Sequence, residues 1–228
     1  MRGILRSRRA FLLHAHMPPP YISFDRTKCT EHFSLFTFRF TLRCMSWLTG
    51  KEIHKQVKLG RIRVEPFDET QCNPGSYDYR LGDTLRVLKC NSVVNGIAHM
   101  DPRKPMAYDE IKIPKEGYML EPGKAYLGTT VEKMGSNFYP WFVTGKSSLG
   151  RLFIENHVCA GLVDVGFFNN LTLEIKAQLP VLVFPNMRFG QAIWFEHVGE
   201  IELYKGKYGA DQGSNAAEPS RSYLDWNT

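Results

Sequence analysis

The chain has 228 residues, of which 43% are hydrophobic and 23% are charged. This composition is typical of a globular protein with one domain or at most two. No apolar run reaches the roughly 18 residues that a membrane-spanning helix needs, and 19 Gly and 13 Pro are too few for a collagen-like or fibrous chain. We therefore expect neither a membrane-spanning nor a fibrous protein.

The formal net charge of +6 is confined to the N-terminal segment. Residues 1–44 contain eight Arg or Lys and two acidic residues, whereas residues 45–228 contain 21 basic and 21 acidic residues. A domain that binds nucleic acid by releasing counterions presents a basic face. Because the body of the chain is neutral, we expect neither nucleic acid nor a membrane as a partner.

Residues 1–44 form a basic, acid-poor extension, interrupted by three prolines at 18–20. Two interpretations remain open. The extension is an organelle transit peptide, whose composition is typically basic and poor in acids, or it is an upstream extension of the reading frame and Met45 is the true start. The second interpretation predicts a cytoplasmic protein, and both predict that residues 45–228 form the domain.

Helix and strand signals begin after Met45. Thr49 and Glu52 form a capping box, and Gly60 can end the helix that follows. Short β-rich runs bounded by turn residues then predict strands at 61–64, 77–81, 84–88, 125–130, 141–144, 171–175, 181–184 and 189–195. Many short strands with few helices predict a mainly β barrel or sandwich. From about residue 205 the tail is polar and without periodicity, so we expect it to be mobile.

The five cysteines include no Cys-x-x-Cys pair, so neither a disulfide framework nor a zinc site is predicted. We interpret them as reduced thiols packed as small hydrophobic groups. His157 and Cys159 would share one side of a strand. A Cys–His nucleophile needs an open, polarised site and a third orienting group, so we favour burial of both beside Val158 and Leu162.

The segment 145–152, Gly-Lys-Ser-Ser-Leu-Gly-Arg-Leu, combines features that suit an anion. Its first glycine allows a close backbone approach, its two serines can cap a short helix, and its two cations can hold phosphate oxygens. The spacing is not that of a nucleoside triphosphatase P-loop. An ordinary serine-capped turn with solvated charges explains the same residues, and the two interpretations remain open on spacing alone.

The predicted strand 171–175 alternates, with Leu171, Leu173 and Ile175 on one face and Thr172 and Glu174 on the other. Glu174 therefore lies opposite the apolar face. It is either a solvated carboxylate or, if this face closes against a neighbouring subunit, a partly desolvated group with a raised pKa that can transfer protons.

Taken in order, six segments of the chain resemble the dCTP deaminase family of the dUTPase-like superfamily. The matching segments are 74–82, 145–152, 160–164, 171–174, 185–191, and Lys207-Tyr208 with 219–223. The resemblance covers about Met45 to nearly the C-terminus. It implies a dUTPase-like β-barrel or β-clip subunit that assembles as a homotrimer with active sites at subunit interfaces. It also implies deamination of dCTP to dUTP and ammonia, with magnesium on the nucleotide triphosphate and no zinc.

The resemblance implies roles for individual residues. Glu174 matches the general acid and base, Ser147 and the Ala160 carbonyl match groups that position the attacking water, and Arg151 matches the arginine that supports the carboxylate. Asp164 matches the aspartate below the deoxyribose. The implied nucleotide-binding set is Lys146, Ser147, Ser148, Leu149, Gly150, Arg151, Asp164, Thr172, Leu173, Glu174, Gln191, Tyr204, Lys207 and Gln212, although Asp211 competes with Gln212.

Some positions depart from the family pattern. Lys146 stands where the family usually has Arg, which keeps the charge but loses the planar fork. Val165 and the Phe-Asn-Asn run at 168–170 also differ and flank the expected base pocket. From residue 205 the tail is expected to be a lid that closes over the triphosphate.

Four functional hypotheses follow. The leading hypothesis is a dCTP deaminase that forms dUTP. The alternatives are a bifunctional enzyme that continues to dUMP, a plain dUTPase in which Asp164 is the working carboxylate, and a nucleotide-binding trimer without catalysis. Glu174 argues against the plain dUTPase, because that reaction needs no proton transfer to the base. Inhibition by dTTP is also left open.

Overall fold

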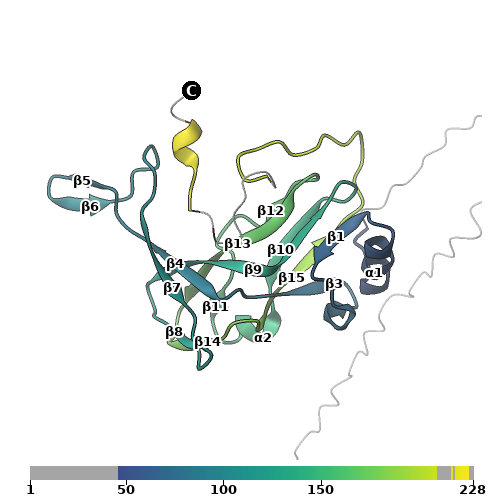
Figure 1. Ribbon diagram of the computed structural model, residues 1–228, viewed down its shortest axis with the longest axis horizontal. Coiled ribbons are helices and arrows are strands. Elements are labelled where there is room, and N and C mark those ends of the chain that lie inside the picture. Colours follow the sequence, from purple (N-terminus) through teal and green to yellow (C-terminus); the bar gives the residue numbers. More distant parts are fainter. Residues whose placement is uncertain (1–45, 210–216, 218, 226–228) are drawn as a thin grey trace, which may run out of the picture. The chain divides into compact units, whose positions relative to one another are not determined.

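The computed structural model describes residues 46–209, 217 and 219–225 (Figure 1). The predictions for residues 1–44, including both interpretations of the start, and for Gln212 lie outside these residues. The helical elements are α1 (Gly50–Lys58), η1 (Glu69–Gln71), α2 (Ser147–Gly150) and η3 (Ser222–Asp225). The strands are β1 (Ile62–Glu65), β2 (Cys72–Asn73), β3 (Ser76–Arg80), β4 (Thr84–Leu88), β5 (Ser92–Val94), β6 (Ile97–His99), β7 (Tyr108–Lys112), β8 (Tyr118–Leu120), β9 (Ala125–Ser136), β10 (Trp141–Gly145), β11 (Ile154–Glu155), β12 (Leu162–Val163), β13 (Phe168–Ala177), β14 (Val181–Val183) and β15 (Arg188–Trp194).

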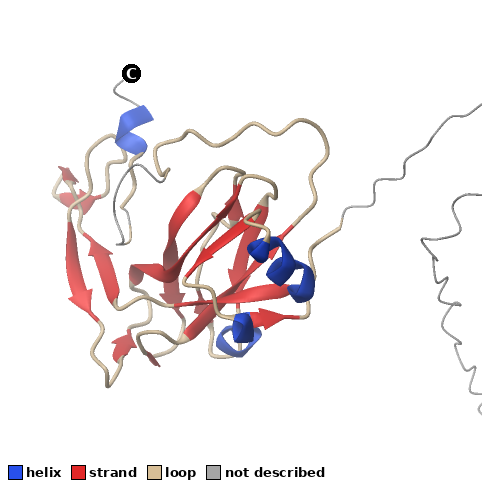
Figure 2. Ribbon diagram, turned by 45° about the vertical axis from the view of Figure 1, so that its right-hand side comes forward, coloured by secondary structure: helices blue, strands red, loops and turns tan. Residues whose placement is uncertain are grey.

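Two antiparallel sheets form the body of the domain. The first has the order β11-β13-β9-β4-β7 with β1 added beside β9, and the second has the order β12-β10-β15-β3-β2. Buried side chains from both sheets form one hydrophobic cluster. At its centre the indoles of Trp141 and Trp194, register partners on β10 and β15, stack with ring centroids 5.4 Å apart. The few short helices lie at the margins of these sheets (Figure 2).

The structure confirms the predicted helix and the predicted strands, with end shifts of zero to six residues. Thr49 is the N-cap of α1 and its hydroxyl accepts from the Glu52 backbone N–H at 3.3 Å. Gly60 follows with φ of +68°, which a residue with a Cβ rarely adopts. The largest differences are at β9, which continues to Ser136, and at β13, which begins at Phe168. Buried Leu171, Leu173 and Ile175 confirm the alternation of β13.

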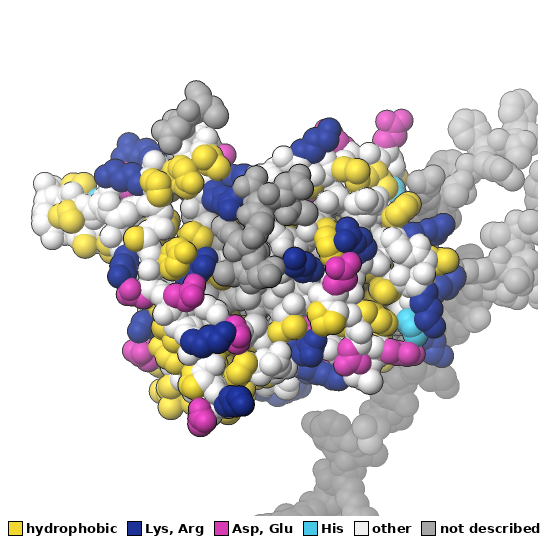
Figure 3. Space-filling view, in the orientation of Figure 1, with side chains coloured by type: hydrophobic (Ala, Val, Ile, Leu, Met, Phe, Trp, Pro, Cys, Tyr) yellow, Lys and Arg dark blue, Asp and Glu magenta, His cyan; other side chains and the backbone are white. Residues whose placement is uncertain are grey.

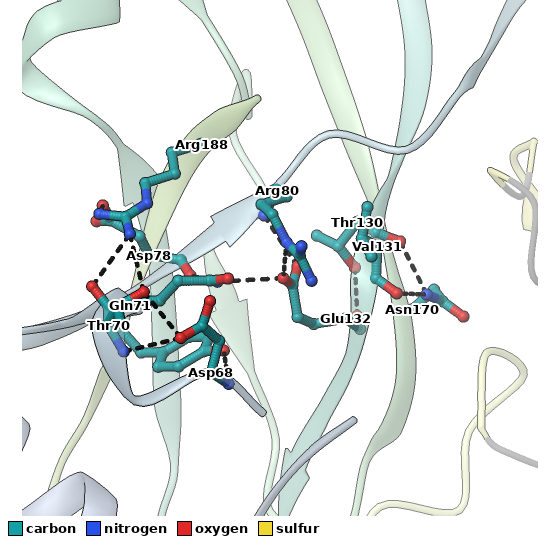
Figure 4. A network of polar contacts seen from close by, with 11 residues as sticks. Asp68, Thr70, Gln71, Asp78, Arg80, Thr130, Val131, Glu132, Asn170 and Arg188 are labelled. Atoms are coloured by element: carbon teal, nitrogen blue, oxygen red, sulfur yellow. Dashed lines mark hydrogen bonds and ion pairs between the residues drawn. The ribbon is translucent and has the colours of Figure 1, made fainter. Parts of the chain in front are cut away.

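Strand β9 carries an irregularity opposite β13 that the sequence did not predict. Asn170 is paired with Lys133, whereas Thr172 is paired with Thr129, so β9 has two extra residues there. The Asn170 amide donates to the released carbonyls of Thr130 (2.8 Å) and Val131 (3.1 Å). The irregularity turns Glu132 fully inward, where it meets Arg80 (Figure 4). Asn170 thus stabilises an irregular backbone next to Thr172 and Glu174.

The hairpin of β5 and β6 projects from the body of the domain (Figure 1). It turns at Asn95 and Gly96, both of which have positive φ, and such a pair favours a two-residue hairpin turn. The C-terminal segment lies beside its base, because the Ser222 hydroxyl donates to the Pro102 carbonyl at 2.9 Å. None of the helices in the described part of the chain has the length and apolar character of a membrane span.

Candidate active site

Glu174 lies on the half-exposed face of β13, and a bend of the chain at 156–160 holds its carboxylate. Its Oε2 accepts from the backbone N–H groups of Val158 (3.0 Å) and Cys159 (3.2 Å). No described residue donates to Oε1. One oxygen is therefore fixed by the backbone, and the other is free to face a water or a ligand. Ala160 follows directly on this bend and is exposed.

The segment 145–152 leaves β10 and forms the single turn α2. The N-cap is Lys146 and it makes no side-chain capping bond, so the expectation that the serines cap the helix is wrong. Ser147 and Ser148 are instead exposed, and their hydroxyls are accessible from solvent. The Arg151 guanidinium, also exposed, donates to the Ser147 carbonyl at 3.1 Å. That bond places the Arg151 guanidinium beside the Ser147 carbonyl.

Lys146 and Gln191 meet at a carboxylate that the sequence analysis did not single out. Asp78, on β3, is completely buried. Its Oδ2 is 2.5 Å from the Lys146 ammonium, and its Oδ1 accepts from the amides of Gln191 (3.1 Å) and Asn73 (2.6 Å). The Arg188 guanidinium is 3.7 Å from Oδ2. Figure 4 shows Asp78 beside Gln71 and Arg188 at one end of the buried polar network.

A second buried polar side chain, that of Asn156, holds the start of the segment 145–152 in place. The Asn156 side-chain amide donates to the Tyr79 hydroxyl (2.9 Å) and to the carbonyls of Thr144 (3.3 Å) and Phe189 (3.2 Å). Burial raises the pKa of the Tyr79 hydroxyl, so it remains protonated and donates to Thr144. These bonds tie the end of β10, where the segment 145–152 begins, to β3 and β15.

Asp164 and Tyr204 line one open groove of about 620 Å³. The groove lies between the turn after β12 and the segment 197–206. The Tyr204 backbone N–H donates to the Val165 carbonyl at 2.7 Å, and the Tyr204 ring meets Phe167 edge to face at 6.0 Å. Asp164 is exposed. The structure therefore brings together two predicted nucleotide contacts that are 40 residues apart.

Lys207 pairs with Asp225 of η3, and this hydrogen bond raises the pKa of the Lys207 ammonium. Arg221 joins the C-terminal segment to residues 207 and 208. Its guanidinium donates to the Lys207 carbonyl at 2.8 Å, and its backbone N–H donates to the Tyr208 hydroxyl at 2.9 Å. Residues 201–206 contain no helix or strand. Lys207 and Tyr208 thus contact Arg221 and Asp225 near the C-terminus.

Two predicted substrate contacts point elsewhere. The side chains of Leu149 and Leu173 are 7% and 1% exposed and belong to the hydrophobic core, so only their backbone groups are available to a ligand. In contrast, Gly150 has open space around it. Thr172 is half-buried on the same face of β13 as Glu174, as the alternation predicted.

The interpretation of the cysteines and of His157 needs correction. Residues 156–160 form a bend and not a strand, so His157 and Cys159 do not share a strand face. Cys90 and Cys159 are exposed, so these two thiols are not packed in the core, whereas the half-buried Cys72 packs against the core as expected. Val158 and Leu162 are 44% and 69% exposed, so they do not bury Cys159 in this chain. The bend is needed to turn two N–H groups toward Glu174.

The sequence contains a signal that Asp78 is buried and paired. An acid between two tyrosines in a predicted strand is unusual, because a buried Asp occurs in proteins only when it is paired. Alternation would have placed Asp78 on the face opposite Tyr77 and Tyr79, but all three are completely buried. For Asn156 we find no comparable signal.

Within the part of the chain that the structure describes, no three His, Cys, Asp or Glu side chains are placed to hold a metal ion. The absence of zinc chemistry was inferred from the resemblance, and it stays a prediction. Magnesium was expected on the triphosphate and not on the protein, so it requires no such cluster.

Comparisons with known proteins agree on the family. A family model described as dCTP deaminase-like matches residues 47–197. A protein of Clostridium beijerinckii named dCTP deaminase, dUMP-forming, is 41% identical over 180 residues, which cover 78% of this chain and 98% of that protein. A protein of Leptospira biflexa with the same name is also 41% identical, over 181 residues that cover 78% of this chain and 97% of that one.

The fold is that of a solved relative. The crystal structure of 2'-deoxycytidine 5'-triphosphate deaminase from Agrobacterium tumefaciens superimposes with a TM-score of 0.53 at 23% identity, over 68% of this chain and 49% of that one. This likeness confirms the expected mainly β, dUTPase-like fold with few helices, while the trimer remains a prediction. Together, the family model, the two relatives and the fold show that the chain belongs to the dCTP deaminase family.

Proposed function

We propose that this chain is a dCTP deaminase that forms dUMP, converting dCTP and two waters to dUMP, ammonia and diphosphate. The observation that carries the proposal is the geometry of Glu174, whose Oε2 is held by two backbone N–H groups while Oε1 faces no described donor. Such a carboxylate can take a proton and return it without changing its position. The names of the two relatives favour dUMP over dUTP as the final product.

In the deamination step, Glu174 takes a proton from the water that adds to cytosine C4. It returns protons to N3 and to the leaving amine, so that the C4–N bond breaks and ammonia leaves. The exposed Ser147 hydroxyl and the Ala160 carbonyl hold the attacking water. Arg151 lies next to Ser147 and supplies positive charge to the phosphates.

In the second step, water cleaves the bond between the α- and β-phosphates of dUTP and releases diphosphate. Asp164 is the carboxylate that activates this water, and it is exposed beside Tyr204 in the 620 Å³ groove. Magnesium bound to the triphosphate would neutralise part of its charge. This route replaces the leading hypothesis of the sequence analysis, in which dUTP was the end product.

We also propose that the active unit is a homotrimer whose interface adjoins Glu174. Three apolar side chains near this residue are exposed: Phe142 (39%), Val158 (44%) and Leu162 (69%). Phe142 and Leu162 are register partners on neighbouring strands, and the Phe142 ring meets the His157 ring edge to face at 6.0 Å. Phe142, His157 and Leu162 are therefore neighbours on one surface. Exposed apolar groups also lie over other parts of the surface (Figure 3). Contiguous apolar surface of this kind marks subunit contacts.

The pair of Lys207 and Asp225 gives a prediction about the tail. If Lys207 contacts the triphosphate, Asp225 competes for the same ammonium. Asp225→Asn is therefore expected to lower the KM for dCTP, by no more than about fivefold because Asp225 is 63% exposed and solvent weakens the pair. Asp109→Asn, which removes the exposed partner of Lys89, is the control and should leave KM unchanged. A higher KM in Asp225→Asn would mean that Asp225 holds Lys207 in place for the nucleotide.

A product-resolved assay tests the proposed function. The full chain is incubated with dCTP, dUTP or dCMP and magnesium, and ammonia, dUTP, dUMP and diphosphate are measured separately. The expected result is stoichiometric ammonia, dUMP and diphosphate from dCTP. Accumulation of dUTP would reduce the function to deamination alone, and diphosphate from dUTP without ammonia from dCTP would indicate a plain dUTPase. Nucleotide binding without any product would reject catalysis.

A further inference from the structure

Asp78 is a buried charge with an unusual set of partners. Its two carboxylate oxygens contact different site residues, with Oδ2 at 2.5 Å from the Lys146 ammonium and Oδ1 at 3.1 Å from the Gln191 amide. Lys146 follows β10 and Gln191 is on β15, so one carboxylate joins two strands of the second sheet. Asn73 on β2 donates a further bond at 2.6 Å.

Burying a carboxylate is unfavourable unless charges and hydrogen-bond donors compensate it. Asp78 has no exposed surface, whereas the Lys146 side chain is 27% exposed. The ammonium therefore has one side toward Asp78 and another toward solvent. Lysine is a flexible point charge that is not oriented by itself, unlike the planar fork of arginine. At this position Asp78 supplies the orientation that the lysine lacks.

We propose that Asp78 is a positioning residue of the nucleotide site, which holds Lys146 and Gln191 at a fixed separation so that both can contact the triphosphate. The inference rests on the proposed function, because it needs a nucleotide at Lys146 and Gln191. Asp78 itself does not touch the nucleotide. It acts by removing the conformational freedom of two side chains before the ligand arrives, which lowers the cost of binding.

Glu132 provides a matched control within the same polar network. It is also completely buried and paired with a cation, since its Oε1 is 2.7 Å from Arg80 Nε. Gln71 joins the two acids, donating to the Asp78 carbonyl (2.6 Å) and to Glu132 Oε1 (3.1 Å) (Figure 4). Glu132, however, contacts neither Lys146 nor Gln191 in the described structure. Loss of either charge should lower stability, but only the loss of Asp78 should affect the nucleotide.

The test compares Asp78→Asn with Glu132→Gln in the full chain, measuring KM and kcat for dCTP, binding of a non-hydrolysable dUTP analogue by calorimetry, and the melting temperature. We expect both variants to melt earlier. We expect Asp78→Asn to raise KM and the Kd of the analogue on the order of tenfold or more, the scale for losing a charge-assisted hydrogen bond, with a smaller change in kcat. Glu132→Gln should keep the wild-type KM and Kd.

The double variant Asp78→Asn/Lys146→Met covers the case in which Asp78→Asn does not fold. It leaves no buried ion without a partner, because Arg188, the other cation near Asp78, is 44% exposed, so the melting temperature is expected to recover while KM and Kd stay raised. Wild-type KM and Kd in either Asp78 variant would overturn the inference and leave the proposed function standing, as would equal rises in Asp78→Asn and Glu132→Gln. Failure of the wild-type chain to bind or convert any of the nucleotides would overturn both.

Discussion

Glu174→Gln is expected to lower the turnover of dCTP on the order of a hundredfold or more, the scale for removing an acid–base group. The amide keeps nearly the shape of the carboxylate, and its oxygen can still accept from the Val158 and Cys159 N–H groups. It cannot take a proton from water. We therefore expect nucleotide binding to persist while ammonia release slows by that factor.

Ammonia release from dCTP and binding of dCTP by calorimetry measure this outcome. Glu155→Gln is the matched control, because Glu155 is an exposed carboxylate on β11, next to β13 in the sheet, and contacts only the Gln178 amide among the described residues. It should retain wild-type turnover. Full activity of Glu174→Gln would reject Glu174 as the proton-transfer group, and loss of binding together with activity would indicate a structural role.

Gly190→Ala is expected to destabilise the domain by overpacking its core. A Cβ at this position would lie 2.1 Å from the Tyr79 hydroxyl and 2.4 Å from Asn156 Nδ2. Both groups are buried and hydrogen-bonded to each other, so neither can move aside without losing partners. Overpacking of this kind costs about 1–3 kcal/mol or more, which for a domain of this size lowers the melting temperature by roughly 2–12 °C.

The control for this substitution is Gly150→Ala, whose Cβ would meet no atom within 4 Å. Thermal unfolding of both variants, followed by circular dichroism, separates the steric effect from the general effect of adding a methyl group. The Gly150 variant should melt within a degree or two of the wild type. A Gly190 variant that melts with it would show that Tyr79 and Asn156 repack freely, contrary to their role in holding the end of β10.

Local sequence patterns predicted the elements well where the physical signal is short-range. The cap at Thr49 and the alternation of Leu171, Leu173 and Ile175 depend only on neighbouring residues, and both are present in the structure. The extra residues of β9 opposite Asn170 left no such pattern, because a bulge depends on how two strands pair. The bend at 156–160, which the sequence analysis treated as a strand, also left no local pattern, because its backbone N–H groups turn toward Glu174, a residue distant in the sequence.

The sequence likewise indicated some residues of the candidate site and not others. The resemblance pointed to Glu174, the segment 145–152 and Asp164, because these residues match the motifs of the family. It did not reveal that Asp78 joins Lys146 to Gln191, or that Asn156 supports the end of β10. These partners come from strands far apart in the sequence, so no spacing rule relates them.

By itself, the sequence determined the mainly β class, the family, and the residue types available for proton transfer and anion binding. Periodicity and residue chemistry are properties of neighbouring positions, and they survive without knowledge of the fold. Only the tertiary structure decided which carboxylates are buried and what compensates them. Burial of a charge depends on everything packed around it, and Asp78 and Glu132, both without exposed surface, acquire their partners only when β3, β9, β10 and β15 come together.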